Sequence, residues 1–459
     1  MFGLGIEAAS FLMFGLAKLS FECATKMARS KDLLRLTKHQ KDIANSPLEA
    51  YKYLIKKMHK SIITIILICF LGCKTDKTPD QSVDLSDWSA VEAQGQHQSI
   101  NMMMWKGDPK INAYMNNHVL PKVKSKYGIG VNIVSGQGNM IVQSLMTELQ
   151  ANKSESEIDL VWINGETFYQ LRQIDALYGP WTSVLPNAEF IDFENPFIGK
   201  DFQQDIDGYE LPWGNVQMTW IYNQAKVKNP PRNKAELLNF VKTHPGQFTF
   251  DNHFTGLTFL KSLLISFAEN PDELYGDFDE ATYKKYSQQL WNYIEQLKPY
   301  LWQSGEVFPE NVAQMHQLLA SGEIWFSMSN NDSEVDNKIS EGLFPKTARA
   351  YVPDFGSIQN SHYLGIPKLS QHKAAAMLVA NFMISAQAQA HKSKPEVWGD
   401  GSVLDLKKLP KNEKQHFKNI AKRQYAPPRS ELDQKALMEL HPEYMIRLAE
   451  DFRTKIINP

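Results

Sequence analysis

The feature that most constrains the fold is a strand–loop–helix pattern that occurs three times between residues 99 and 177. Each unit begins with a short apolar or β-branched run, at 100–105, 131–134 and 158–163, and continues into a segment with helical spacing. Strands that alternate with helices predict a parallel sheet with helices on its faces. Ligands bind beyond the carboxyl ends of such strands. We therefore expect the loops 106–109, 135–139 and 164–166 to share one edge.

The remaining chain continues in the same mixed style. We expect extended segments at 211–222, 323–328, 350–352 and 363–366, and helices at 233–243, 255–268, 279–302, 374–390, 411–422 and 430–455. Pro121 predicts a kink or break in the helix that follows the first loop. The fold class predicted from these patterns is α/β.

Composition excludes several classes of protein. The chain has 459 residues and a mass of 52.4 kDa, enough for two or three domains. Hydrophobic residues make up 43% and charged residues 22%, which is close to a globular average and excludes wholesale disorder and a polytopic membrane protein. A net charge of -2, without a basic patch among aromatic residues, argues against nucleic-acid binding.

The first 72 residues differ from the rest. They hold 11 basic and 5 acidic residues, against 38 basic and 46 acidic residues from residue 73 onward. The three cysteines, at positions 23, 69 and 73, all precede residue 74, whereas all ten tryptophans follow it. The later part therefore has no disulfide framework, zinc–cysteine site or cysteine nucleophile, and it holds the large core.

An apolar run at 61–71 follows a lysine-rich stretch. About 11 residues are too few to span a bilayer, which takes roughly 20, but they suit the apolar part of a secretory signal. The next residues, Phe70-Leu71-Gly72-Cys73, resemble the bacterial lipobox, in which the cysteine is diacylated. We expect a signal at 58–72, lipidation of Cys73 and a polar tether at 73–98. The alternative is a buried strand with an incidental cysteine.

Residues 1–57 precede this signal. We expect them to be an upstream extension ahead of the true start at Met58, because secretory signals begin near the N-terminus. The alternative is a genuine additional amphipathic segment, since residues 1–19 are apolar apart from Glu7 and Lys18.

Searches for catalytic motifs give little. The chain lacks a phosphate-binding P-loop, a His-Glu-x-x-His zinc motif and a Gly-x-Ser-x-Gly elbow. Gly136 and Gly138 follow a strand but lack the third glycine of a dinucleotide site, so an anion cradle or a plain tight turn is the better interpretation. We expect no metal site and no cofactor. A carboxylate pair of Glu166 and Asp332 is the one enzymatic alternative.

Aromatic and polar residues near the expected strand ends are the candidates for a ligand pocket, because aromatic walls with a few polar groups are typical of such pockets. The alternative is that each tryptophan is a core residue. The candidate ligand-binding residues are Trp105, Asp108, Gly136, Gly138, Asn139, Asn164, Glu166, Trp213, Thr255, Asn330, Asp332 and Tyr363.

Several longer motifs, spread from about residue 99 to 455, carry a family resemblance. They are Trp105-Lys-Gly-Asp-Pro-Lys-Ile-Asn, Asp159-Leu-Val-Trp-Ile-Asn-Gly-Glu-Thr-Phe, Tyr178-Gly-Pro-Trp, Pro212-Trp-Gly, Phe254-Thr-Gly, Trp398-Gly-Asp-Gly-Ser-Val-Leu-Asp and His441-Pro-Glu-Tyr. With these motifs the chain resembles the extracellular solute-binding proteins of ATP-driven (ABC) importers, of the YnjB-type group near the iron-, thiamine- and polyamine-binding branch.

The resemblance implies a two-lobed, type II periplasmic-binding-protein-like fold with a ligand cleft between the lobes. Lobe 1 would comprise 99–211 and 350–392, and lobe 2 would comprise 213–345; the position of the C-terminal helices at 393–459 stays open. It further implies a small-molecule solute, an ABC-transporter permease and ATPase as partners, and a lipid-anchored monomer in the cell envelope, facing the periplasm or exterior. An envelope hydrolase and a structural envelope lipoprotein are the competing hypotheses.

Overall fold

The larger of two main sheets contains the three predicted strands. In the computed structural model, which describes residues 85–458, β1 (Ser99–Met104) lies between β2 (Gly130–Ser135) and β3 (Leu160–Ile163), and all three run parallel. Strand β10 (Ser357–Gly365) pairs antiparallel with β3, and β6 (Glu210–Gln217) pairs antiparallel with β10. The predicted strand–loop–helix units are therefore confirmed.

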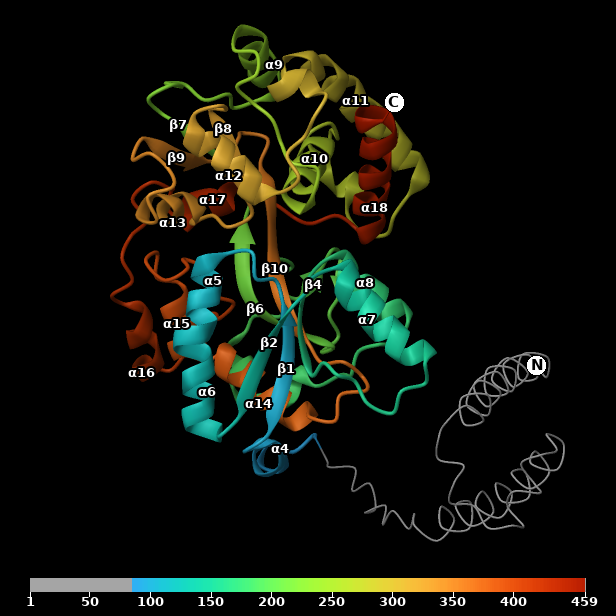
Figure 1. Ribbon diagram of the computed structural model, residues 1–459, viewed down its shortest axis with the longest axis vertical. Helices are drawn as coiled ribbons and strands as arrows, with labels where there is room; N and C mark the ends of the chain where they lie inside the picture. Colours follow the sequence, from blue (N-terminus) through green and yellow to red (C-terminus); the bar gives the residue numbers. More distant parts are fainter. Residues whose placement is uncertain (1–84, 459) are drawn as a thin grey trace, which may run out of the picture. The chain divides into compact units, whose positions relative to one another are not determined.

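Helices cover both faces of this sheet (Figure 1). The helices of this part are α4 (Trp88–Gly95), α5 (Pro109–Tyr114), α6 (Leu120–Tyr127), α7 (Asn139–Gln150), α8 (Glu166–Gln173), α14 (Lys373–Met383), α15 (Ala386–Lys392) and α16 (Lys411–Lys414). We call this sheet with these helices lobe 1. A π-helical turn, Met115–Val119, separates α5 from α6. It confirms the interruption expected at Pro121, which cannot donate a backbone hydrogen bond to the preceding turn.

A second core forms around a three-stranded antiparallel sheet, in which β7 (Thr219–Asn223) lies between β8 (Phe326–Ser329) and β9 (Ala348–Tyr351). Its helices are α9 (Lys234–Thr243), α10 (Phe254–Ile265), α11 (Glu280–Leu297), α12 (Val312–Ser321), α13 (Glu334–Ser340), α17 (Arg429–Leu432) and α18 (Pro442–Asp451). We call this sheet with these helices lobe 2. Helix α10 is buried on nearly all sides, and its buried residues include the polar Thr258, Lys261 and Ser262.

Two long strands, β6 and β10, run side by side between the two lobes (Figure 1). At one end of β10, Ile358 packs in the core of lobe 2; toward the other end, Leu364 packs in the core of lobe 1. A short hairpin of β4 (Lys200–Asp201) and β5 (Gln204–Asp205) precedes β6, and β11 (Ala436–Leu437) pairs with β10. The lobes are thus joined by extended backbone rather than by a large shared core.

The residues that sequence left unassigned divide between the lobes. Trp398, Val403 and Leu409 join the core of lobe 1, whereas Leu440 and Phe452 join that of lobe 2. The structure also corrects one expected boundary. Residues 348–358 lie with lobe 2, because β9 pairs with β7 in the three-stranded sheet and its side chains pack into the cores there.

Other expectations need correction for local reasons. Residues 88–95, expected to be polar tether, form α4, which is capped by Asp87 and packs so closely on α14 that a Cβ on Gly95 would lie 2.8 Å from backbone atoms of Ala374. The helix expected at 374–390 breaks before Ser385, whose side chain caps α15. The helix expected at 430–455 is interrupted by β11, and α18 restarts at Pro442.

Membrane-spanning helices and clusters of metal-ligating side chains are both absent from the described residues. Between residues 85 and 458, no helix has both the length and the hydropathy that crossing a bilayer requires. Within the same range, no group of three or more histidine, cysteine, aspartate or glutamate side chains has the arrangement of a metal site. The predicted signal, Cys73 and the extension at 1–57 lie outside the described residues.

Candidate functional site

The loop after β1 holds two candidate residues, Trp105 and Asp108, and the second of them contacts lobe 2. Trp105 is half-buried, and its ring lies so close to Gly107 that a Cβ there would be 2.4 Å from it. Asp108 caps α5, since its Oδ1 accepts hydrogen bonds from the backbone N–H groups of Lys110 and Ile111. Its Oδ2 lies 2.9 Å from Nζ of Lys338 on α13. Asp108 therefore links lobe 1 to lobe 2.

The other two loops of this edge are shaped by glycine. Gly138 (φ 48°) and Gly165 (φ 62°) adopt left-handed conformations directly before α7 and α8, which residues with a side chain rarely adopt. Gly136 packs against Met103, while Asn139 is exposed and Asn164 half-buried. These two loops place backbone N–H groups and carboxamides at the edge where the sequence predicts a ligand.

Two aromatic candidates lie inside lobe 1 instead. Trp213 has no exposed surface and packs against Trp162, His362 and Trp398 with ring-centroid distances of 4.9–5.4 Å. Tyr363 is equally buried, and its hydroxyl donates to the backbone carbonyl of Lys200 at 2.9 Å. The two side chains belong to different core clusters on opposite faces of the sheet. In this arrangement neither ring offers surface to a solute, so both stabilise the core.

The candidates from lobe 2 separate into two groups. Asn330 Nδ2 donates to Thr255 Oγ1 at 3.2 Å, which joins the end of β8 to α10. Asp332 is 2% exposed and binds the guanidinium of Arg429 through both oxygens, at 2.7 and 2.8 Å, with Arg423 at 3.1 Å. Burial alone would raise the pKa of Asp332, but Arg429 and Arg423 together lower it below its ordinary value. Asp332 is therefore a permanent anion within an ion-pair cluster.

Several residues that sequence analysis missed hold the lobes together. Lys338 contacts three carboxylates, and although burial opposes it, Glu334 and Asp108 raise the pKa of its ammonium above its ordinary value. On the same helix, Asn337 donates to the carbonyl of Trp398 at 2.7 Å. Nothing in the sequence marks these positions on α13, because their partners in lobe 1, Trp398 and Asp108, lie 61 and 230 residues away.

On the other side of the lobe boundary, acidic side chains gather around one lysine. Glu439 Oε2 lies 2.6 Å from Nζ of Lys261, and Asp201 Oδ2 accepts the N–H of Gly165 at 2.7 Å. Glu210 is fully buried, and neither of its carboxylate oxygens has a hydrogen-bond partner. Burial is the main cause that raises the pKa of Glu166, and it raises the pKa of Asp201 and Glu210 well above their ordinary values.

This burial predicts a pH-dependent contribution from Glu210. Because its pKa is higher in the folded chain, the folded state binds more protons, so stability falls as pH rises from about 4.5 toward neutrality. Glu210→Gln removes the cost of an unpartnered buried carboxylate, and we expect it to raise the free energy of unfolding at pH 8 by about 1–3 kcal/mol and much less at pH 5. Urea unfolding of the full chain at both pH values measures this.

Glu155→Gln is the matched control, because Glu155 is exposed, and it should change stability by less than about 0.5 kcal/mol at either pH. A Glu210→Gln variant that is destabilised equally at pH 5 and pH 8 would contradict the prediction.

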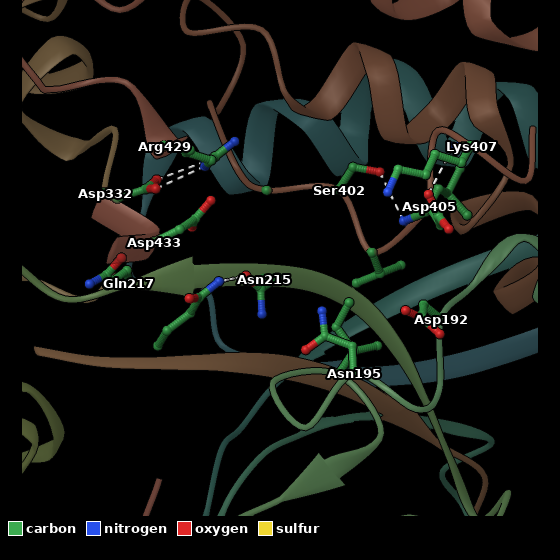
Figure 2. A pocket seen from close by; sticks show the side chains of 15 residues that line it. Asp192, Asn195, Asn215, Gln217, Asp332, Ser402, Asp405, Lys407, Arg429 and Asp433 are labelled. Carbon is green, nitrogen blue, oxygen red and sulfur yellow. Dashed lines mark hydrogen bonds and ion pairs between the residues drawn. The ribbon is translucent and has the colours of Figure 1, made fainter. Parts of the chain in front are cut away.

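A cavity of about 340 Å³ lies beside the crossing strands, with Asn215 and Gln217 of β6 and Gln359 of β10 in its lining (Figure 2). None of the residues of the three candidate loops, at 106–109, 135–139 and 164–166, is among those that line this cavity. Asp332 and Arg429 point toward one another at one end, and Asp192, Asp405 and Lys407 lie at the other (Figure 2). Many of its polar groups are paired: Asn215, for example, accepts from Gln359 and donates to a backbone carbonyl.

These contacts give no support to a catalytic carboxylate pair. Asp332 is occupied by two arginines, whereas Glu166 belongs to the separate acidic group near Lys261. The Asp108–Lys338 pair and the two crossing strands instead join two bodies, each of which has its own core.

Comparison with known proteins identifies the family. The model of the bacterial extracellular solute-binding protein family matches residues 120–406. Protein YnjB of Escherichia coli (strain K12) is 35% identical over 338 residues, which cover 73% of this chain and 87% of YnjB.

Solved structures support the same fold. The spermidine/putrescine ABC transporter substrate-binding protein PotD of Streptococcus pneumoniae has a TM-score of 0.53 at 15% identity, covering 78% of this chain and 99% of PotD. The periplasmic binding protein AfuA of Actinobacillus pleuropneumoniae, solved with exogenous fructose-6-phosphate bound, has a TM-score of 0.55 at 14% identity, covering 79% of this chain and 99% of AfuA. Iron-bound HitA of Pseudomonas aeruginosa has a TM-score of 0.51 at 16% identity, covering 78% of this chain and 99% of HitA.

These two-lobed proteins share the fold, and the family match makes the chain a binding protein for transport rather than an enzyme. The chain belongs to the family of bacterial extracellular solute-binding proteins.

Proposed function

We propose that the chain is the solute receptor of an ABC importer, which captures a small solute between its lobes and delivers it to a permease and its ATPase. The observation that carries the proposal is the connection between two separate cores by the paired strands β6 and β10. Within the described residues, this pair is the only part of a sheet that connects the two cores. Extended crossing strands suit hinge bending, and a solute that touches both lobes favours the closed arrangement by its differential affinity.

The candidate binding surface is the edge formed by the loops after β1, β2 and β3. Trp105, Asn164 and Asn139 keep exposed area there, and Thr255 and Asn330 are the candidates from lobe 2. Gly136, Gly138, Asp108 and Glu166 complete this proposed set. The aromatic ring of Trp105 supplies apolar contact, and the carboxamides supply hydrogen bonds, which is the usual division of roles in a small-molecule site.

Anchoring is the other part of the proposal. A diacylated Cys73, at the end of the predicted signal 58–72, would hold a monomeric receptor in the cell envelope, facing the periplasm or exterior, since two acyl chains give a stable attachment. Mass spectrometry of the membrane-extracted protein tests this: an unmodified Cys73 with residues 58–72 still attached would refute it.

Solute binding should stabilise the fold. We expect a true solute at about 100 times its dissociation constant to add about 2.7 kcal/mol to the free energy of unfolding. Thermal-shift measurements on the full chain would begin with spermidine, putrescine, fructose 6-phosphate and iron, the compounds associated with the solved proteins that share this fold. Trp105→Ala should reduce the shift that the solute causes.

Trp88→Ala is the control for Trp105→Ala, because Trp88 on α4 packs against the core of lobe 1 and away from the candidate loops. An equal solute-induced shift in wild type and Trp105→Ala would remove Trp105 from the site. The absence of any shift across a broad metabolite library would count against the receptor function.

A further inference from the structure

The hairpin β4–β5 reaches from lobe 1 into the core of lobe 2. Its base belongs to lobe 1: the carbonyl of Lys200 accepts the hydroxyl of Tyr363 at 2.9 Å, and Asp201 accepts the N–H of Gly165 at 2.7 Å. Its tip does not. Phe202 is 1% exposed and is a member of the lobe 2 core cluster, together with Leu260 and Leu264 of α10.

The tip makes three direct contacts with lobe 2. The Nζ of Lys261 lies 4.0 Å from the centroid of the Phe202 ring, a cation–π contact. Gln203 donates from Nε2 to the carbonyl of Glu439 at 2.6 Å, and its Oε1 accepts the N–H of Gly276 at 3.3 Å. The side chain of Gln203 thus forms hydrogen bonds with two separate segments of lobe 2.

The backbone of the tip is strained for its sequence. Phe202 and Gln203 both have left-handed conformations, with φ of 46° and 64°, in a two-residue hairpin turn. Such turns favour Asn-Gly, because side chains beyond Cβ are poorly tolerated at positive φ. A Phe-Gln turn persists only where surrounding contacts over-determine it, and here those contacts come from lobe 2.

The fit on the lobe 1 side is equally close. A Cβ on Gly165 would lie 2.5 Å from the Phe202 ring, so this glycine leaves room for the ring at the start of α8. The ring therefore lies between α8 of lobe 1 and α10 of lobe 2. Separation of the lobes would expose its apolar surface and break both bonds of Gln203.

We propose that Phe202 and Gln203 form an interlobe latch, which holds the lobes closed and so sets the solute affinity of the receptor. This rests on the proposed function only in taking closure to be the binding motion. Because the latch favours the closed arrangement, it raises the fraction of receptor that is competent to bind, and with it the apparent affinity for solute.

Hydrogen–deuterium exchange of the full chain, without added solute, tests the latch. In Phe202→Ala we expect about tenfold faster exchange at 274–278 and 438–441, which the tip contacts, and also at 333–338 and 398–401, the contacts on the opposite side of the lobe boundary that the tip does not touch. Gln203→Asn, which tolerates positive φ but is one methylene shorter, should show the same pattern to a smaller degree.

Phe417→Ala is the matched control, because Phe417 packs against the core of lobe 1 and should leave all four segments unchanged. Faster exchange confined to the segments that the tip contacts would show local loosening and overturn the latch, as would wild-type exchange throughout. Since no solute is used, a failed solute screen leaves this result standing, and a failed latch leaves the receptor function standing.

Discussion

Replacing Asp332 with asparagine is expected to lower the free energy of unfolding by about 3–5 kcal/mol, because it leaves two arginines without their buried counter-ion. Asp332 is 2% exposed, binds Arg429 with both oxygens and lies 3.1 Å from Arg423. Asparagine keeps the shape of the side chain but carries no charge. Urea unfolding of the full chain at pH 7 measures the loss.

Asp354→Asn gives the matched control. Asp354 also faces two cations, with Lys435 at 2.7 Å and Arg232 at 3.7 Å, but its side chain is 55% exposed. Exposed pairs contribute at most about 1 kcal/mol, since water screens them. Similar losses in the two variants would mean that Asp332 does not act as a buried anion.

The alternation of strand and helix was enough to predict the three strand–loop–helix units of the parallel sheet, because each strand and its helix are neighbours in sequence. Residues 100–105 and 131–134 carry the apolar and β-branched residues typical of strands, and the loops between them and their helices contain the turn-forming residues. Breaks inside long helical patterns were harder to predict. Ser385 stops one such pattern through its side-chain cap, a local competition that hydrophobic spacing does not record.

The candidate residues near the ends of the parallel strands and those on the crossing strands lie in different environments. Asp108 lies in the loop between β1 and α5 and reaches the lobe boundary, as position in a parallel sheet predicts. Trp213 and Tyr363 were chosen as aromatic residues near strand ends, but they lie on the crossing strands, where alternate side chains point into the cores on both faces. The face of the sheet to which a side chain points depends on strand register, which the sequence alone does not give. The contacts of Lys338, Lys261 and Phe202 were not predicted because their partners come from distant segments of the chain.

The second large effect is expected at Lys392, which lies with Asp400 in the interior of lobe 1. Both side chains are fully buried and in direct contact, and the ammonium also donates to the carbonyls of Trp213 and Gly401. Burial lowers the pKa of Lys392 to about 8 although Asp400 opposes this change. Lys392→Met leaves Asp400 buried without its cation, and we expect a loss of about 3–5 kcal/mol in the free energy of unfolding.

The double variant Lys392→Met/Asp400→Asn separates the pair from its surroundings. If the cost of Lys392→Met comes from the stranded carboxylate, neutralising Asp400 should recover about 1–3 kcal/mol of it, because the two groups share one interaction. Lys368→Met is the control, since Lys368 pairs with Asp175 at the exposed surface and should cost less than about 1 kcal/mol. The loss in the double variant could instead equal the sum of the losses in Lys392→Met and Asp400→Asn. That result would show that Lys392 stabilises the fold through its hydrogen bonds to the backbone carbonyls of Trp213 and Gly401. The Trp-Gly-Asp-Gly segment would then be held by hydrogen bonds rather than by charge.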